Sequence, residues 1–348
     1  MEFLFELLVW VVFIVSSLLV VSHFLRKMYK LDFDCDERHF AKADDGVFLA
    51  MYRLKPDEIK HKRPVILCHG MGSNRYNLHL KPGFSLAEHL KNEGFDCWLV
   101  ELRGHGESDW PENGYDFDDM ARLDLPAFIK RIQELTGQEE VLYVGHSMGG
   151  MLLYAYLGSN ENVPIKAAVA VGSPAKLGNH WGIKLSKILK PFKRITISFY
   201  FSFMIPFMSL LKHHKAELNP ENVDNRLSRQ MTANAVSRES RELLLQFVDW
   251  MKNRSFTSND GIDYLENAKN VSIPLFLMAG SKDKLVPRHQ VRAFYDKTPE
   301  EYRHWRDCGS EGGMLRDYGH VDMLMGYGAA EEVFPAISEW LLEYGCDK

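Results

Sequence analysis

Short apolar runs of strand length alternate with amphipathic stretches of helix length through the middle of this chain, and this alternation limits the folds that it can adopt. Pro64–His69 and Asp96–Glu101 are two such runs, and the helical stretch Leu80–Asn92 lies between them. The alternation continues further along the chain. Helices are predicted at Leu123–Thr136 and Gly149–Leu157, and the strands Val141–Val144 and Ala167–Val171 follow them in turn. Repeated βαβ units of this kind predict an α/β fold whose mostly parallel sheet carries helices on both faces.

Segments on either side of this region extend the predicted sheet. Arg38–Ala43 and Val47–Leu54 flank an Asp-Asp-Gly turn and are expected to form a hairpin at the sheet edge. Nearer the C-terminus, a strand is predicted at Ile273–Ala279 and a closing helix at Glu331–Leu342. A chain of 348 residues is long enough for one such domain with an insertion.

The alternation stops from Pro174 to Lys269, and this segment is predicted to be a helical cap inserted after the sixth strand. It contains an apolar run, Ile195–Leu211, between two basic clusters. The run is expected either to contact a membrane or to pack on the core as a pair of cap helices. A second membrane span is disfavoured, because the run has only 17 residues, contains Pro206, and would separate the last strands from their own sheet.

The N-terminal stretch Phe3–Leu25 is almost wholly apolar and, as a helix, just spans a hydrocarbon core of about 30 Å. Acidic residues precede it and basic residues follow it, which is the reverse of a secretory signal peptide, so an uncleaved anchor is predicted. Arg26, Lys27 and Lys30 on its C-terminal side indicate a cytoplasmic catalytic domain. A buried core helix is the alternative. The expected division is an anchor at 1–30, a core at 31–173 and 270–348, and the cap at 174–269.

Cysteine usage and net charge exclude several classes of function. Five cysteines without a C-x-x-C pair indicate reduced thiols rather than a disulfide framework or a zinc site; they are Cys35, Cys68, Cys97, Cys308 and Cys346. A net charge of −5 leaves no basic excess for nucleic acid, which is not expected as a partner.

The sequence Gly145-His146-Ser147-Met148-Gly149 matches the G-x-S-x-G nucleophile elbow. Glycines are needed two residues before and after the serine, because a Cβ there would collide with neighbouring backbone in the sharp strand-to-helix turn. An apolar strand runs directly into this motif and a helix is predicted to follow it. Ser147 is therefore the candidate nucleophile.

A nucleophilic serine needs a base and a carboxylate that orients the base, in the chain order serine, acid, histidine for this kind of elbow. Asp283 directly follows the strand Ile273–Ala279, and His320 lies further along the chain. Asp322 is too close to His320 in sequence to orient its ring easily, so Asp283 is the predicted partner.

Two backbone N–H groups are expected to form the oxyanion hole that acyl transfer requires. One belongs to Met148, which follows the serine, and the other to Met71, in the His69-Gly70-Met71-Gly72 loop after an earlier strand. His69 is interpreted as a residue that shapes this loop. Arg103–Ser108 is interpreted as a tight structural turn near the cleft.

These motifs resemble the α/β-hydrolase fold from residue 38 to the C-terminus. Gly94-Phe-Asp-Cys-Trp-Leu99, Tyr143-Val-Gly-His-Ser147 and His320-Val-Asp-Met-Leu-Met-Gly326 are similar to the acid lipase and sterol ester lipase branch. Gly-His-Ser-Met-Gly-Gly is equally typical of monoacylglycerol lipases and lysophospholipases, and Met148 stands where the acid lipases usually have Gln. The resemblance implies a cap after strand six and a lipid-ester substrate.

The sequence thus predicts a membrane-anchored serine hydrolase acting on a carboxylic ester of a lipid, such as an acylglycerol, a lysophospholipid or a sterol ester. Its partners would be that ester and the membrane, and neither a metal nor an organic cofactor is expected. An amidase, peptidase or acyltransferase with the same three residues is one alternative. A catalytically silent, membrane-tethered scaffold is another.

Overall fold

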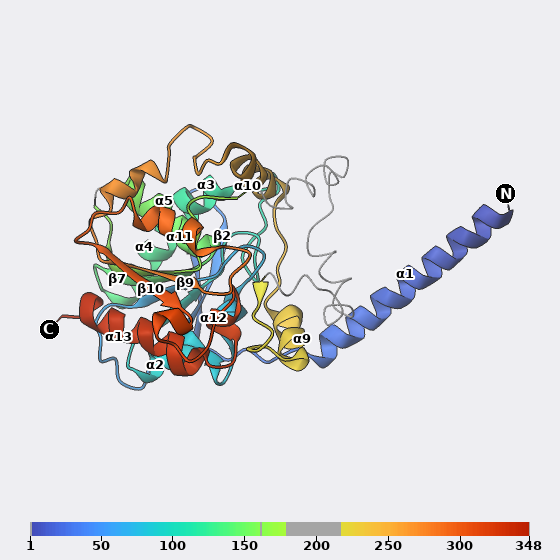
Figure 1. The fold of residues 1–348 in the computed structure, drawn as a ribbon, viewed down its shortest axis with the longest axis horizontal. Helices are drawn as coiled ribbons and strands as arrows, with labels where there is room; N and C mark the ends of the chain where they lie inside the picture. The colour runs from blue at the N-terminus through green and yellow to red at the C-terminus, as the bar shows by residue number, and fades with distance from the viewer. Residues whose placement is uncertain (1, 161, 179–216, 348) are drawn as a thin grey trace.

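A computed structural model describes residues 2–160, 162–178 and 217–347 and contains one eight-stranded sheet with helices packed on both of its faces (Figure 1). The spatial order of the strands is β1-β2-β6-β3-β7-β8-β9-β10. Their bounds are Glu37–Lys42 (β1), Phe48–Leu54 (β2), Val65–Cys68 (β3), Cys97–Val100 (β6), Val141–His146 (β7), Ile165–Val171 (β8), Leu275–Gly280 (β9) and Arg303–Cys308 (β10).

Only β2 runs against the common direction of the other strands in this sheet. β1 pairs with β2, and β2 with β6, in antiparallel register, whereas every other neighbouring pair in the sheet is parallel. The sequence predictions of a mostly parallel sheet and of a hairpin at its edge are therefore confirmed. In a parallel sheet the carboxyl ends of the strands meet at one edge, where α/β proteins bind their ligands.

The helices bury two separate hydrophobic cores against this sheet. Within the described residues their bounds are Glu2–Met28 (α1), Leu86–Asn92 (α2), Phe117–Asp119 (α3), Leu125–Thr136 (α4), Met148–Ser159 (α5), Asn225–Asn234 (α9), Arg241–Asn253 (α10), Arg288–Tyr295 (α11), Asp322–Met325 (α12) and Phe334–Gly345 (α13). Residues of α4, α5 and α11 lie in one core, and residues of α2, α12 and α13 in the other.

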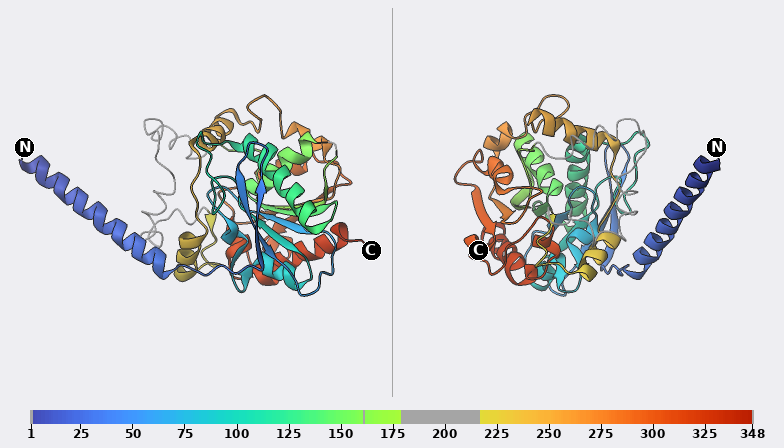
Figure 2. Two further views of the ribbon diagram at one scale, coloured as in Figure 1. Left: turned by 180° about the vertical axis from the view of Figure 1, so that it is seen from behind. Right: turned by 45° about the vertical axis from the view of Figure 1, so that its right-hand side comes forward.

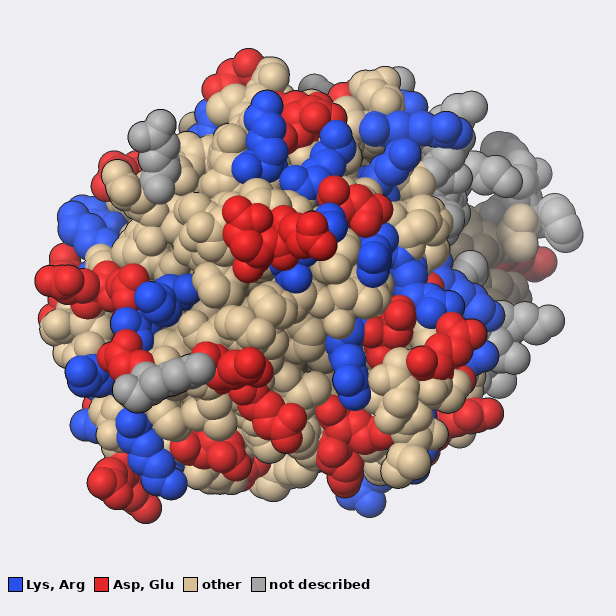
Figure 3. Space-filling model, turned by 60° about the vertical axis from the view of Figure 1, so that its left-hand side comes forward, with Lys and Arg blue, Asp and Glu red and all other residues tan. Residues whose placement is uncertain are grey.

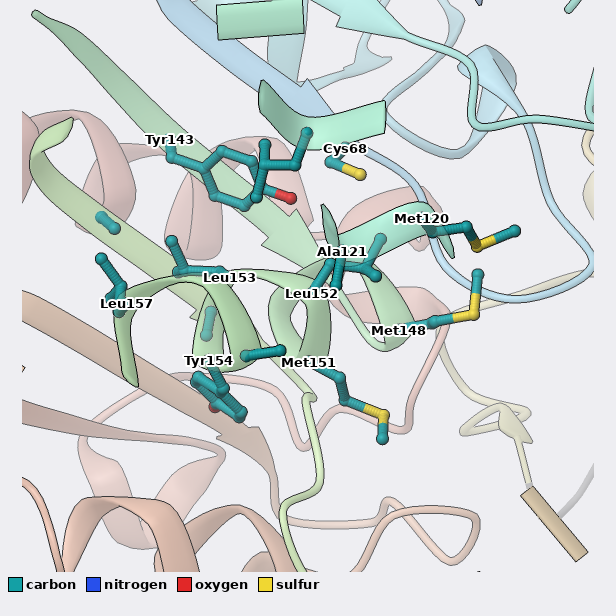
Figure 4. Close-up of a cluster of buried hydrophobic side chains, with 14 of the residues drawn as sticks. Cys68, Met120, Ala121, Tyr143, Met148, Met151, Leu152, Leu153, Tyr154 and Leu157 are labelled. Carbon is teal, nitrogen blue, oxygen red and sulfur yellow. The ribbon is translucent and has the colours of Figure 1, made fainter. Parts of the chain in front are cut away.

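Helix α5 is apolar nearly all round, as expected of a helix buried on every side. Leu152 and Leu153 lie beside Tyr143 and Cys68 of the sheet in a continuous apolar cluster (Figure 4). The Tyr143 hydroxyl also donates a 2.7 Å hydrogen bond to the Gly149 carbonyl. Packing and this hydrogen bond together fix the start of α5 relative to β7.

The prediction of a helix from Leu80 is wrong, because the helix α2 begins at Leu86. A small hairpin of β4 (His79–Lys81) and β5 (Phe84–Ser85) occupies the preceding residues. Gly83 turns this hairpin at a φ of +77°, and the Ser85 side chain then caps α2 by accepting the Glu88 N–H.

The segment 174–269, which the sequence predicts to be an inserted cap and which is called the insertion below, lies in the connection between β8 and β9. Its described part contains α9 and α10, while the apolar run Ile195–Leu211 lies outside the described residues.

Helix α1 projects from the domain, and among the described residues its C-terminal end lies beside α9 (Figures 1 and 2). The segment Phe5–Met28 contains an 18-residue window with a mean hydropathy of 2.4, and it is long and apolar enough to span a membrane. Just beyond it, the Asn234 side chain donates to the Tyr29 carbonyl at 2.9 Å and accepts the Leu31 N–H at 2.9 Å. The end of α1 is thus bonded to the insertion.

The surface on the far side of the domain from α1 is of mixed charge. Acidic and basic side chains are interspersed there around patches of uncharged residues (Figure 3). Such mixing is the ordinary arrangement of a soluble surface.

Candidate active site

Ser147 stands in the tight turn between β7 and α5, with a φ of 53° and a ψ of −116°. It is one of two described non-glycine residues with positive φ. A Cβ on Gly145 would lie 2.5 Å from the Gly149 backbone, and a Cβ on Gly149 would lie 2.5 Å from the Cys68 carbonyl oxygen. The steric reason predicted for both glycines is therefore present in the structure.

Three segments that are far apart in sequence bring the predicted catalytic residues together. His320 Nε2 lies 2.9 Å from Ser147 Oγ, and His320 Nδ1 lies 2.7 Å from Asp283 Oδ2. Ser147 follows β7, Asp283 follows β9, and His320 lies in the loop before α12. All three therefore lie near the carboxyl ends of the parallel strands.

The carboxylate of Asp283 is buried and has both oxygens occupied. Its Oδ1 accepts the Val286 N–H at 2.7 Å, which leaves Oδ2 to accept from His320. Since Nδ1 of His320 donates to this carboxylate, Nε2 is the ring nitrogen that faces Ser147 and can accept its proton.

The electrostatic surroundings of His320 favour its protonated form. Burial disfavours the charged ring, but the charge and hydrogen bond of Asp283, with smaller contributions from Glu217 and Asp322, outweigh it and raise the pKa of His320 above the ordinary value of 6.5. The imidazolium that would form when His320 takes a proton is thereby stabilised.

Asp322 does not orient the His320 ring, in agreement with the sequence argument. Its Oδ2 accepts the Gly319 N–H at 3.0 Å and the Asn222 side chain at 2.8 Å, and its Oδ1 accepts the Asn219 N–H at 3.0 Å. Asp322 thus fastens the loop of His320 to residues 219–222 of the insertion.

The loop His69–Gly72 follows β3 and lies against Ser147. A Cβ on Gly70 would come within 3.0 Å of the Ser147 Cβ. His69 Nδ1 lies 2.8 Å from the Gly70 carbonyl, and His69 Nε2 accepts the Leu102 N–H at 3.2 Å. These bonds agree with the predicted role of His69 in shaping the loop. Burial first and neighbouring His105 second hold the pKa of His69 well below its ordinary value, so the ring is neutral.

Both predicted oxyanion donors lie beside this turn. Met148 is the first residue of α5, and a helix leaves the N–H groups of its first turn without an intrahelical partner. Met71 follows Gly70, which packs on Ser147. Within the part of the chain that the structure describes, no acceptor is bonded to the N–H of Met71 or Met148.

Two buried residues that sequence reasoning did not assign to the site lie behind the His69–Gly72 loop. His105 Nε2 is 3.0 Å from Glu239 Oε1, and both side chains are almost fully buried. His105 belongs to the turn Arg103–Ser108, whose expected tight geometry is present. Glu239 comes from the insertion, where no motif marks it.

Comparison with known proteins decides the family. Residues 63–323 match the α/β-hydrolase fold family, which is three quarters of the chain. The chain belongs to this family.

Its relatives include proteins named as lipases. "Probable lipase C1672.09" of Schizosaccharomyces pombe is 25% identical over 90% of this chain and 75% of that protein. Gastric triacylglycerol lipase of Rattus norvegicus is 35% identical over 36% of this chain and 35% of that protein. Among solved structures, an esterase from Thermogutta terrifontis has a TM-score of 0.64 at 19% identity, over 88% of this chain and 99% of its own, which shows a shared fold. These matches support a carboxylic ester hydrolase.

We predict that Gly149→Ala destabilises the domain and lowers kcat together. The added methyl would meet the Cys68 carbonyl at 2.5 Å, and relieving this collision must move β3 and the loop that follows it away from Ser147. The expected loss is about 1–3 kcal/mol of unfolding free energy in urea. Gly137→Ala is the matched control, since Gly137 has a φ of +71° and open space around it, and it precedes β7 whereas Ser147 follows that strand. That variant should lose stability but keep kcat, and an unaltered kcat in Gly149→Ala would contradict the steric argument.

Proposed function

We propose that this protein is a serine hydrolase that cleaves carboxylic esters of lipids through an acyl-enzyme on Ser147. The observation that carries the proposal is the continuous hydrogen-bonded series from Ser147 Oγ through His320 to Asp283, at 2.9 Å and 2.7 Å. Hydrogen-bonded series of this geometry recur on unrelated folds, where they activate an uncharged hydroxyl as a nucleophile near neutral pH.

In the first half of the reaction, Ser147 Oγ attacks the ester carbonyl carbon and its proton passes to His320 Nε2. The carbonyl oxygen becomes an oxyanion, which accepts hydrogen bonds from the N–H groups of Met71 and Met148. The intermediate then collapses and breaks the bond between the carbonyl carbon and the alcohol oxygen. His320 returns the proton to that oxygen, so the alcohol leaves and the acyl group stays on Ser147.

In the second half, water attacks the acyl-enzyme and gives a proton to His320 Nε2. The bond between the acyl carbon and Ser147 Oγ breaks, Oγ recovers the proton, and the carboxylic acid leaves. Asp283 stays ionised throughout and holds the ring in the tautomer that both halves need.

A lipid ester is favoured by the lipase names of the relatives and by α1. Only 6% of the most apolar window of α1 is buried against the rest of the chain, so a large apolar surface would face water without a bilayer. We infer that α1 anchors the enzyme in a membrane. The basic residues Arg26, Lys27 and Lys30 after the apolar stretch favour a cytoplasmic domain.

We expect Ser147→Ala to abolish ester hydrolysis, by at least about 10⁴-fold in kcat, and to abolish labelling by a fluorophosphonate. Only a hydroxyl is lost, so circular dichroism and the urea midpoint should be preserved. A panel of p-nitrophenyl esters and acylglycerols of graded chain length would then define the substrate. Labelling without turnover of any ester would redirect the search to amides or to acyl transfer, and an unlabelled wild-type protein would support a silent scaffold.

The pH dependence of kcat/KM should follow the titration of His320. The ring accepts a proton only when it is neutral, and its pKa is raised above 6.5, so kcat/KM should rise with pH to a midpoint on the alkaline side of that value. Asp283→Asn removes the main group that raises this pKa and should lower both the midpoint and kcat. A profile that stays flat through the neutral range would contradict the assignment of His320 as the base.

The anchor makes a separate prediction about topology. The full chain should stay with membranes after an alkaline carbonate wash, and protease should spare the domain in sealed vesicles that enclose the cytoplasmic face. Digestion of the domain in those vesicles would reverse the orientation. A mature protein whose N-terminus lies beyond α1 would instead identify the segment as a cleaved signal.

A further inference from the structure

A carboxylate from the insertion lies directly behind the His69–Gly72 loop. Glu239, between α9 and α10, is only 2% exposed. Its Oε1 accepts the N–H of Gly72 and lies 3.0 Å from His105 Nε2, and its Oε2 accepts the Tyr115 hydroxyl at 3.3 Å. Donors from three separate segments therefore meet on one buried side chain.

The segment before Glu239 is bonded along the same loop. The Ser237 N–H donates to the Gly72 carbonyl at 2.7 Å, and the Ser73 hydroxyl donates to the Ala235 carbonyl at 2.8 Å. Gly72 is thus held by the insertion through both its N–H and its carbonyl. Its φ of +64° is in the left-handed region, so this peptide has a conformation that few residues other than glycine adopt.

The other end of the loop is fixed from the core. His69 bonds the Gly70 carbonyl, and Gly70 packs against the Cβ of Ser147. Met71 therefore lies between one residue held by the core and one held by the insertion. The direction of its N–H depends on both attachments.

We propose that Glu239 is a positioning residue, which fixes Gly72 and thereby aims the Met71 N–H at the oxyanion of the tetrahedral intermediate. This inference rests on the proposed function. It adds to that function the idea that the insertion supports the oxyanion hole. When the N–H groups of an oxyanion hole do not point at the oxyanion, they stabilise the transition state poorly, even though the substrate still binds.

A buried carboxylate so close to an oxyanion would oppose catalysis unless its charge were compensated. His105 Nδ1 lies 2.8 Å from the Arg103 carbonyl while Nε2 faces Glu239, so both ring nitrogens face acceptors, as in an imidazolium. Burial works against that charge, but the charge of Glu239 outweighs it and raises the pKa of His105. The positive ring neutralises the carboxylate, so Glu239 can hold Gly72 without repelling the oxyanion.

The test compares Glu239→Ala, Glu239→Gln and Glu242→Gln in the full-length enzyme. The readouts are kcat and KM for a soluble short-chain ester and the inhibition constant of a trifluoromethyl ketone, which forms a tetrahedral adduct with serine. Glu239→Ala should lower kcat and ketone affinity by a similar factor of about 10 to 10² and leave KM nearly unchanged. Glu239→Gln keeps an oxygen that can accept the Gly72 N–H and should recover most of the loss. Exposed Glu242 lies three residues further on, and Glu242→Gln should match the wild type in all three readouts.

Glu239→Ala leaves the charge of His105 buried without a partner and could prevent folding. In that case the double variant Glu239→Leu with His105→Phe replaces both partners by apolar side chains and should fold, with the same joint loss of kcat and ketone affinity. If a folded variant that lacks an acceptor for the Gly72 N–H keeps wild-type kcat and ketone affinity, Glu239 does not have the proposed positioning role. A wild type that neither hydrolyses esters nor reacts with fluorophosphonate overturns the proposed function itself.

Discussion

The site depends on one crowded crossing, where the end of β3 passes the first turn of α5. Gly149 lies so close to the Cys68 carbonyl, and Gly70 so close to the Ser147 side chain, that neither position has room for a relaxed Cβ. This contact decides how near the His69–Gly72 loop can come to the nucleophile. The parallel pairing of β3 with β7 holds the two segments at that separation. Strand pairing, helix packing and the geometry of the turn therefore together determine the positions of the atoms around Ser147.

The insertion is attached on two sides of Ser147. Near its middle, Asn219 and Asn222 bond to Asp322 beside His320, and further along the chain Ser237 and Glu239 bond to Gly72. One attachment supports the loop of His320, the proposed base, and the other supports the loop of Met71, a proposed oxyanion donor. The insertion thus contributes to the rigidity of the groups that it neighbours, which is separate from any role in admitting substrate.

Local sequence patterns predict the nucleophile elbow and most strands of the sheet, because these features depend on residues that are close together in the sequence. The elbow needs only residues 145 to 149 and a strand before them, and the sheet needs only runs of apolar residues. The start of α2 was misplaced because a periodic pattern continued through Gly83, whose positive φ turns the chain. Strand β10 was not predicted, because as an edge strand it is only partly buried and its residues are largely polar.

Contacts made by the tertiary fold could not be predicted in the same way. Glu239 reaches Gly72 across 167 residues, and neither position carries a pattern that points to the other. Asp283 and His320 can be singled out in the sequence only because the expected chain order of serine, acid and histidine limits the choices once Ser147 is the candidate nucleophile. No such rule on chain order relates His105 to Glu239, so their buried pair can be recognised only in the folded structure.

The distance along the chain between Ser147 and His320 has a consequence for how the protein acquires reactivity. The two are 173 residues apart, and the loop that supplies the histidine belongs to the last elements of the sheet. In a partly folded chain Ser147 would have an ordinary hydroxyl environment, without His320, its proposed base, beside it. The fraction of molecules labelled by a phosphonate would therefore measure the fraction that has completed folding. Such labelling could be used to follow folding of this protein without a substrate.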